Sequence, residues 1–186
     1  MPQTKPMISV ENVVASADVM QKMDLDDITR KFPDIEYHPD RFPGLVFRLK
    51  TPKTATLIFT SGKMVCTGSK SEVLARKAVK TIVQNLRKGG IIVKKDATVT
   101  IQNIVASINL GGKIQLEKAA RTLPRSMYEP EQFPGLIHRM LDPKTVILLF
   151  SSGKLVCAGA KHEEDVYRAV NNLHVLLEEK ELMLYD

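Results

Sequence analysis

Apolar and polar positions follow two different periods along the chain. Alternating or continuous β-branched and apolar residues, bounded by Gly, Pro and Ser, predict extended strands. Apolar residues spaced three to four positions apart predict amphipathic helices instead. In the first half, strands are predicted at residues 8–17, 35–38, 45–50, 54–60 and 63–68, and helices at residues 24–32 and 71–88.

Local signals support these boundaries. Acidic side chains open the segment 24–32 and basic side chains close it, which suits the helix dipole. Ser71 is a candidate N-cap for the longer helix, and Gly89 and Gly90 end it. The segment from Pro39 to Gly44 predicts a turn.

The whole pattern occurs twice. Residues 10–95 align with residues 101–186 at a single offset of 91 without a gap, and 31 of the 86 pairs are identical. Two copies of this length indicate a small α/β unit duplicated in tandem, not a solenoid. We therefore expect two domains, residues 1–95 and 96–186. The longest shared motifs are Asn12–Ser16 with Asn103–Ser107, Phe42–Leu45 with Phe133–Leu136, and Ser61–Cys66 with Ser152–Cys157.

The strands are apolar on both faces. Residues 54–59 and 145–150 place apolar side chains at consecutive positions, where an antiparallel sheet with one solvent-exposed face should alternate. Two helices per repeat can cover only one face of such a sheet, and no segment is left to cover the other. An uncovered apolar face of this kind indicates a binding surface.

Charge narrows the class of partner. The net charge is +6; residues 1–95 hold 17 Lys and Arg against 9 Asp and Glu, and residues 96–186 hold 10 against 12. A basic surface favours a polyanionic partner. No apolar run approaches the roughly 18 residues of a membrane span, and Met1 to Met7 lack a signal sequence. Cys66 and Cys157 are predicted to be separate buried thiols.

The sequence does not predict an enzyme. The four histidines are scattered, and there is no metal-ligand spacing and no complete phosphate-binding loop. Ser61-Gly62-Lys63 resembles the end of such a loop, but a hairpin explains it. We expect no metal and no cofactor.

The paired strands, Phe-Pro-Gly-Leu turns and Ser-Gly-Lys hairpins resemble those of the TATA-box-binding protein family. The resemblance covers essentially the whole chain. It implies an α+β fold of two tandem pseudo-symmetric repeats that form a ten-stranded curved antiparallel sheet, a saddle with four helices on its convex face. It also implies a transcription initiation factor whose concave underside binds the minor groove of A·T-rich (TATA-box) promoter DNA.

The resemblance assigns phenylalanines as wedges that kink the DNA. The family is itself the standard example of apolar wedges that part a base step. Two of the rings lie at Pro-Gly loop tips, which are poor places for core packing. The other two would suggest core packing on their own, and only the resemblance assigns them to DNA. The four are Phe42, Phe59, Phe133 and Phe150.

Further family positions match the floor of the groove. An Asn amide can donate to the N3 and O2 acceptors of A·T pairs, although an Asn that satisfies a strand end is an open alternative. Apolar contact disfavours G·C, whose exocyclic amine would be buried without a partner. The floor candidates are Asn12, Val14, Leu57, Val65 and Thr67, with Asn103, Val105, Leu148 and Val156 in the second repeat.

Basic positions flank these strands and mostly recur at the same offset. They are candidates for phosphate contacts, which fix position and make binding salt-dependent. They are Arg41, Arg48, Lys63, Lys70, Arg139, Lys154 and Lys161.

Three departures from the family pattern weaken the symmetry. The family usually has Gln before both strand asparagines; Gln102 is present, but Glu11 stands at the other position. Ala158 stands where the second repeat should match Thr67, and Gln132 precedes Phe133 where some relatives have an apolar residue. These departures put a symmetric hydrogen-bond scheme in doubt, but not the wedges.

The resemblance also implies protein partners. Glu129 and Glu131, in the second stirrup loop, would contact transcription factor B, which brings RNA polymerase indirectly, although a solvated acidic loop is an open alternative. On the convex back, the basic helix 71–88 could meet acidic partners or upstream DNA. A short N-terminus without a basic tract suggests an archaeal protein that acts on the nucleoid in the cytoplasm, without a nucleus. A protein-interaction module on the same fold, an auxiliary domain of a repair enzyme, and a weak homodimer that hides the underside stay open as alternatives.

Overall fold

The chain divides into two units in the computed structural model, which describes residues 4–185. The first-repeat unit is Asn12–Gln102, and the second-repeat unit comprises the chain up to Glu11 together with the chain from Asn103 onward. Each unit therefore contains the first residues of a strand whose larger part belongs to the other unit. This division follows contacts, whereas the boundary at residues 95 and 96 follows sequence equivalence and stays a prediction.

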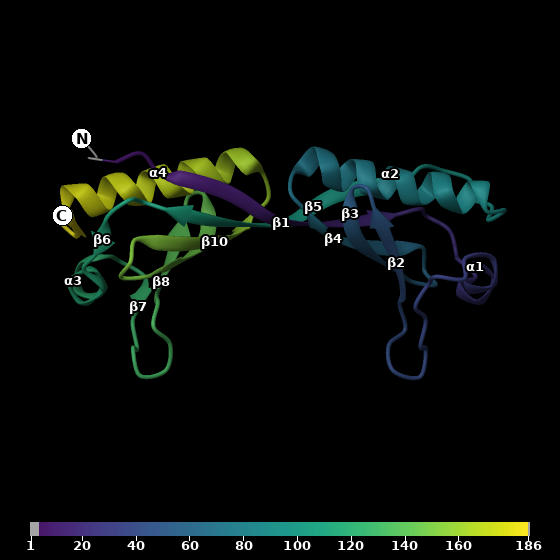
Figure 1. Ribbon diagram of the computed structural model, residues 1–186, viewed down its shortest axis with the longest axis horizontal. Coiled ribbons are helices and arrows are strands. Elements are labelled where there is room, and N and C mark those ends of the chain that lie inside the picture. Colours follow the sequence, from purple (N-terminus) through teal and green to yellow (C-terminus); the bar gives the residue numbers. More distant parts are fainter. Residues whose placement is uncertain (1–3, 186) are drawn as a thin grey trace. The chain divides into compact units, whose positions relative to one another are not determined.

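The first repeat forms four long strands and two helices (Figure 1). Within the first-repeat unit the strand order is β2-β3-β4-β1, and the neighbours pair antiparallel. The predicted segments match these elements to within one or two residues. The elements are β1 (Met7–Asp18), α1 (Leu25–Lys31), β2 (Leu45–Lys50), β3 (Lys53–Ile58), β4 (Lys63–Ser69) and α2 (Glu72–Lys88).

The second repeat has the same succession with three added short strands. Its main sheet has the order β5-β10-β9-β8-β7, and β11 pairs with β6 in a separate small sheet. The small sheet was not predicted. The elements are β5 (Thr98–Asn109), β6 (Lys113–Ile114), α3 (Leu116–Thr122), β7 (Ser126–Met127), β8 (Leu136–Leu141), β9 (Lys144–Leu149), β10 (Lys154–Ala160), α4 (Glu163–Glu179) and β11 (Met183–Leu184).

The predicted fold class is confirmed: two α+β repeats with antiparallel sheet and four helices among the described residues. The strand number needs a correction, because the main sheet strands number nine in residues 4–185 and not ten. The predicted strand at residues 35–38 is reduced to one bridge between Glu36 and Val46. Its counterpart β7 makes two pairs, with Ile137 and His138, and qualifies as a short strand.

Each long helix packs on one face of its sheet (Figure 1). Ser71 caps α2 as predicted, since its Oγ accepts from the backbone N of Leu74 at 3.0 Å. The buried stripe of α2 includes Ala75, Ile82 and Leu86. The core therefore lies between helix and sheet, and no helix of residues 4–185 covers the other face of either sheet (Figure 1).

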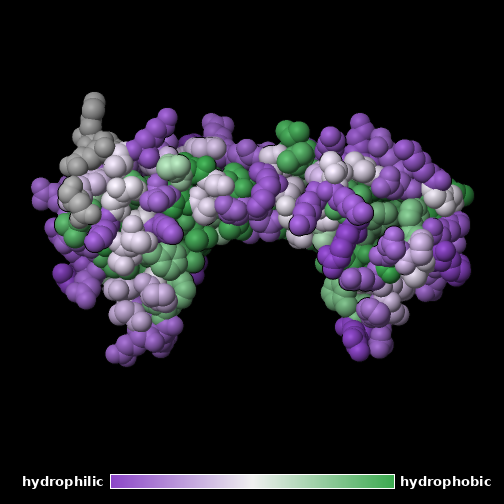
Figure 2. Space-filling view, in the orientation of Figure 1, coloured by the Kyte–Doolittle hydropathy of each residue, from purple (hydrophilic) through white to green (hydrophobic). Residues whose placement is uncertain are grey.

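Exposed apolar surface remains at the root of the loop that projects from each unit, and polar side chains cover the loop tip (Figure 2). These loops precede β2 and β8, and each projects away from the long helix of its own unit (Figure 1). Residues 1–7 are predicted to lack a signal sequence, and residues 1–3 of this segment lie outside the described residues. Within residues 4–185, no helix combines the length and the apolar character that a membrane crossing requires.

Candidate nucleic-acid interface

Alternation within each strand sorts the side chains onto two faces. In β1, Val13, Ala15 and Ala17 are buried under the helix, whereas Asn12, Val14 and Ser16 are only partly buried. We call the second face the open face. The Asn, Val and Ser of this motif therefore share a face, and β5 repeats the arrangement.

On the open face, strand register aligns apolar side chains into a row. In the first-repeat unit, Val65 of β4 pairs with Leu57 of β3 on one side and with Ser16 of β1 on the other, and Leu57 pairs in turn with Val46. All are partly exposed. Such a surface can lie against an apolar or flat partner without leaving buried polar groups unpaired. The equivalent row in the second-repeat unit is Ile137, Leu148, Val156 and Ser107.

The four predicted wedge phenylalanines form two matching pairs. The ring centroids of Phe42 and Phe59 lie 5.9 Å apart at an interplanar angle of 63°, and those of Phe133 and Phe150 lie 5.9 Å apart at 66°. This edge-to-face geometry is a favourable aromatic contact. Phe42 is 43% exposed and Phe133 39% exposed, which is unusual for so large an apolar side chain.

A glycine at the base of each loop permits the ring pair. A Cβ on Gly44 would lie 2.6 Å from Cε2 of Phe42 and 3.0 Å from Cε1 of Phe59. Gly135 shows 2.7 Å and 3.0 Å to the equivalent atoms of its own pair. The rings close directly over the glycine, so any larger residue would separate them or push them outward.

Equivalent backbone turns hold both loop tips. The backbone N of Phe42 donates to the carbonyl of His38 at 3.0 Å, and that of Phe133 donates to the carbonyl of Glu129 at 3.0 Å. The side chains of Glu129 and Glu131, the candidates for protein contact, are exposed on the second loop, and Arg41 is exposed on the first. The same backbone hydrogen bond therefore closes both loop tips.

The two asparagines perform the same structural task in both units. Oδ1 of Asn12 accepts from the backbone N of Gly68 at 2.7 Å, and Oδ1 of Asn103 accepts from that of Gly159 at 2.6 Å. Each glycine has a positive φ, +99° and +94°, at an irregularity in the strand pairing. Because the amide oxygen is fixed, the NH₂ group of the asparagine is left as donor on the open face. The same side chain is therefore compatible with both interpretations from the sequence. Its oxygen satisfies a backbone group of the strand, and its NH₂ group stays available as a donor.

The predicted hydroxyl asymmetry is also on the open face. Thr67 pairs with Ala55, and its Oγ1 donates to the carbonyl of Ala55 at 3.4 Å. The equivalent Ala158 pairs with Val146 and adds only a methyl group. The second-repeat unit is accordingly more apolar at this position.

Most candidate cations border the open face. Arg48 follows Val46 by two residues on β2 and pairs with Ala55, and Arg139 pairs with Val146 in the same way. Arg48 forms an exposed ion pair with Glu36, with 3.2 Å from Nη2 to Oε2. The remaining basic candidates, Lys63, Lys70, Lys154 and Lys161, are exposed at the ends of β4 and β10.

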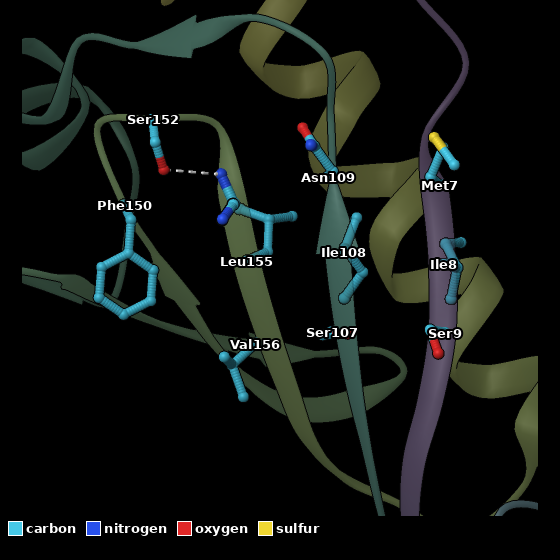
Figure 3. A pocket seen from close by; sticks show the side chains of 11 residues that line it. Met7, Ile8, Ser9, Ser107, Ile108, Asn109, Phe150, Ser152, Leu155 and Val156 are labelled. Atoms are coloured by element: carbon cyan, nitrogen blue, oxygen red, sulfur yellow. Dashed lines mark hydrogen bonds between the residues drawn. The ribbon is translucent and has the colours of Figure 1, made fainter.

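A cavity of about 600 Å³ in the second-repeat unit is lined by open-face residues and by one of the candidate cations (Figure 3). Phe150 and Val156 line one side, Met7 and Ser9 of β1 line the other, and Ser107 lies between them. Lys154 also lines it, so a cation borders an otherwise largely apolar hollow. The cavity is open to solvent.

The alternation slips by one residue in the middle of β5. Ile101 and Ile104 are both buried, so Gln102 and Asn103 between them both lie on the open side. Nε2 of Gln102 donates to Oγ of Ser16 at 2.8 Å. Glu11 and Ser107 are the equivalent residues of the other repeat.

The pair of Glu11 and Ser107 has the opposite hydrogen-bond polarity. Oγ of Ser107 donates to Oε1 of Glu11 at 2.8 Å, so the serine is the donor here and the acceptor in the first-repeat unit. The carboxylate therefore lies on the open face, beside the candidate floor residues of the second-repeat unit. The predicted break in symmetry is present as a real difference in donors and acceptors.

Titratable side chains in the core are separate from this face. Burial lowers the pKa of His138, which is 2% exposed, and that of His174, also 2% exposed. Burial raises the pKa of Cys66, and that of Cys157 to about 11. Both cysteines are free and buried, as predicted. Among the described residues, no cluster of His, Cys, Asp or Glu could hold a metal ion.

Sequence reasoning missed several open-face residues. Val46 and Ile137 complete the apolar rows, and Met7 and Ser9 line the cavity. Val46 and Ile137 lie two positions before Arg48 and Arg139, so the period of two in a strand could have identified them. Met7 and Ser9 could not be found this way, because strict alternation would put them on the same face as the buried Val13 and Ala15.

Comparison with known protein families gives a match over nearly the whole chain. The family model described as "Transcription factor TFIID (or TATA-binding protein, TBP)" matches residues 7–89 and 98–180. The two matched segments coincide with the two repeats.

Individual relatives agree with the family match. The chain is 55% identical to a TATA-box-binding protein of Pyrodictium occultum over 92% of this chain and 86% of that protein. It is 52% identical to one of Sulfurisphaera tokodaii over 91% of this chain and 85% of that protein. Its fold matches the solved structure of Methanococcus jannaschii TBP with a TM-score of 0.83 and 44% identity, over 92% of this chain and 98% of the other.

Proposed function

The chain belongs to the TATA-box-binding protein family, whose members are DNA-binding transcription initiation factors and not enzymes, and from this premise we propose how it binds its promoter. Its open face binds the minor groove of A·T-rich, TATA-box DNA. The observation that carries the proposal is the apolar open face together with one phenylalanine pair in each unit, in which Phe42 and Phe133 are the exposed rings. An exposed apolar surface of this kind requires a partner.

The two phenylalanine pairs act as the wedges that kink the duplex. Each exposed ring is supported from behind by a second ring and by the glycine at the loop base. A preorganised ring can enter a base step without a loop rearrangement, so only the unstacking of the DNA opposes it. Burial of the open face against the widened groove offsets that cost.

The floor residues read the groove by shape and by donor pattern. The free NH₂ groups of Asn12 and Asn103 can donate to the N3 and O2 acceptors of A·T pairs. Val14, Val65 and their equivalents leave no acceptor for the amine of a G·C pair. The result is a preference for A·T with little discrimination between A·T and T·A.

Basic side chains at the border of the open face contact phosphates. Arg48 and Arg139 occupy equivalent places on β2 and β8, and the lysines at the ends of β4 and β10 extend the border. Arg48 would exchange its solvent-exposed partner Glu36 for a phosphate at little cost, because such surface pairs contribute little. These contacts fix register and make binding weaken as salt rises.

Protein partners use other surfaces. The exposed Glu129 and Glu131 contact transcription factor B, which connects the complex to RNA polymerase. The helix α2 carries five basic residues and one acidic residue, and α4 carries one basic and five acidic residues, so the two helices suit different partners. The protein acts on the nucleoid in the cytoplasm, as suits its archaeal relatives.

The test is DNA bending by a variant in which Phe42 and Phe133 are both Ala. Fluorescence transfer between the ends of an A·T-rich promoter duplex is expected to report a bend with the wild type and none with the variant. Circular dichroism is expected to show that the variant stays folded. Equal binding of a G·C-rich duplex by the wild type without a bend would refute the proposal.

The same variant separates the alternative, a protein-interaction module whose open face is covered by a protein or by a second copy of the chain. In that case DNA bending would be absent from the wild type as well. Unfolding of the variant would show that these rings are core residues, which their exposure argues against.

A further inference from the structure

A basic cavity borders the open face of the second-repeat unit. Its volume is about 660 Å³, and Val146, whose side chain lies on the open face, is among its lining residues. Four of the ten basic residues of the second half line it, although that half of the chain is net acidic. The overall charge of this half therefore does not account for the cluster. The four are Arg125, Arg139, Lys144 and Lys161.

The first repeat carries carboxylates where this cluster has other residues. At the offset of 91, Asp34 is the equivalent of Arg125. Glu36 is the equivalent of Met127, and its Oε2 lies 3.2 Å from Nη2 of Arg48. Arg48 can exchange this partner for a phosphate, but the carboxylate stays close to the phosphate and repels it. The two repeats therefore differ in how well this border binds an anion.

Two hydrogen bonds fix Arg125 beside Arg139. The backbone N of Arg139 donates to the carbonyl of Arg125 at 3.0 Å, and Nε of Arg125 donates to the carbonyl of Arg139 at 3.1 Å. Within residues 4–185, the two Nη groups of Arg125 and the guanidinium of Arg139 make no hydrogen bond or ion pair. Both side chains therefore keep donors for a ligand, and a guanidinium matches the oxygens of a phosphate in one plane.

The backbone at Arg125 has a conformation that arginine rarely adopts. Its φ is +52°, in the left-handed region that glycine and asparagine occupy more easily. Residues held in such conformations are concentrated at ligand-binding and catalytic sites, where the gain in binding offsets the strain. This conformation supports a binding role for the Arg125 side chain.

The other lining residues indicate which anion fits. Asp165 also lines the cavity, but its Oδ1 lies 3.2 Å from Nη1 of Arg168, which offsets its charge. Met140 and Leu141 add an apolar wall beside the cations. Apolar contact is favourable for the carbon atoms of a deoxyribose and not for a free, hydrated phosphate ion. The cavity therefore suits a phosphate of the DNA backbone.

We propose that Arg125, together with Arg139, binds a backbone phosphate of the DNA at this cavity, a contact that the first repeat lacks. This inference rests on the proposed function and deepens it. The second-repeat unit then holds its part of the duplex more strongly than the first-repeat unit does. Since phosphates carry no sequence information, the contact adds affinity without changing the preference for A·T.

The experiment measures the affinity of Arg125→Asn for an A·T-rich duplex over a range of salt concentrations. Asparagine accepts a positive φ, so the variant loses the guanidinium and keeps the backbone. Binding is expected to weaken about tenfold. The slope of log affinity against log salt should fall by about 0.9, the value of one phosphate contact. A variant that was only less stable would lose affinity with an unchanged slope, and calorimetric unfolding measures its stability directly.

Two further variants separate charge from geometry and from position. Arg125→Lys should keep most of the salt slope but recover only part of the affinity, because an ammonium group cannot bind two phosphate oxygens in one plane. Asp34→Asn is the matched control, since it places the same residue at the equivalent position of the first repeat. It removes a carboxylate and should not weaken binding.

Three results would overturn the inference. The first is wild-type affinity and salt slope in Arg125→Asn, and the second is an equal loss of affinity in Asp34→Asn. The third concerns a free anion as the ligand: inorganic phosphate, titrated into the DNA-free protein at constant ionic strength, would bind through Arg125 while Arg125→Asn left the affinity for DNA unchanged.

Failure of this inference is distinguishable from failure of the proposed function. If only the inference fails, the wild type still bends the A·T-rich duplex and binds it more tightly than a G·C-rich one, and Arg125→Asn does the same. If the proposed function fails, the wild type bends neither duplex and its affinity does not depend on A·T content.

Discussion

Replacement of Gly44 by alanine tests whether the geometry of a phenylalanine pair controls DNA bending. The new Cβ would lie 2.6 Å from Cε2 of Phe42 and 3.0 Å from Cε1 of Phe59. Carbon atoms in good contact are about 3.5–4.0 Å apart, so the nearer ring has to move by about 1 Å. Phe42 is 43% exposed and can swing outward, whereas Phe59 is held at the end of β3.

The effect on stability should be small. Separation of the rings costs the aromatic contact, about 0.5–1.5 kcal/mol. Gly44 does not have a positive φ, so alanine fits the backbone and recovers about 0.4–1 kcal/mol by restricting the unfolded chain. The two effects nearly cancel, and the melting temperature should change by no more than about 2–4 °C.

The effect on DNA should be larger than the effect on stability. Full burial of a phenylalanine is worth about 1.5–3 kcal/mol, and the exposed share of Phe42 places about 1 kcal/mol at stake in the base step. A displaced ring forfeits that share, so the dissociation constant should rise by about fivefold. Only the kink at the end of the site that Phe42 contacts should be lost. The other kink should remain, because the second pair, Phe133 and Phe150, is unchanged.

The assay is fluorescence transfer across an end-labelled A·T-rich duplex, titrated with protein, together with calorimetric unfolding. Gly135→Ala makes the same change in the second repeat, at 2.7 Å and 3.0 Å, and should give the same partial loss of bending. Val73→Ala, on the solvent side of α2, is the control that should alter neither quantity. Wild-type bending and affinity in Gly44→Ala would refute the reasoning, as would a fall in melting temperature of many degrees.

Two further predictions concern Asn12 on the open face and the two buried histidines. Asn12→Asp keeps the acceptor for the backbone N of Gly68, which lies 2.7 Å away, but loses the NH₂ donors. Calorimetry should therefore show unchanged stability, and DNA titration should show an affinity for A·T-rich DNA that is weakened by about tenfold or more. Unchanged affinity would mean that this amide does not contact the bases. Burial lowers the pKa of both His138 and His174 in the folded protein, so the unfolded chain binds more protons and the free energy of unfolding should fall as pH drops below about 6.5. His138→Phe introduces the residue that the first repeat has at the equivalent position, Phe47. This variant should reduce the pH dependence of the free energy of unfolding, measured by denaturant titration between pH 5 and 7, by about the share of one histidine. An unaltered pH profile would contradict the attribution of this dependence to His138.

Local patterns were enough to predict most of the elements. Apolar spacing and the cap at Ser71 predicted the long helix, and the hairpin signals predicted β2 to β4. The segment 35–38 was overestimated, because a β-rich tetrapeptide does not specify how many partners it finds. The small sheet of β6 and β11 was missed for the same reason: two-residue strands have no periodicity of their own.

The candidate site was predictable to the extent that it repeats. Duplication at one offset distinguished the paired Asn, Val, Phe and Arg positions from ordinary surface residues, and the structure places Asn12 and Asn103 in the same hydrogen bonds. The site residues that differ between the two repeats were harder to predict from the sequence. Glu11 was recognised as a departure, but its partner Ser107 and the polarity of that hydrogen bond were not.

The sequence by itself determined that two equivalent units exist, which side chains each contributes, and that both faces of the strands are apolar. Those properties are local or periodic, and a period of two or 3.6 residues is visible without coordinates. Only the tertiary structure decided the slip in alternation at Gln102 and Asn103, the ring contacts over Gly44, and the binding of each Asn oxygen to a glycine N–H. These depend on strand register and on the approach of segments far apart in the chain, which no short-range pattern encodes.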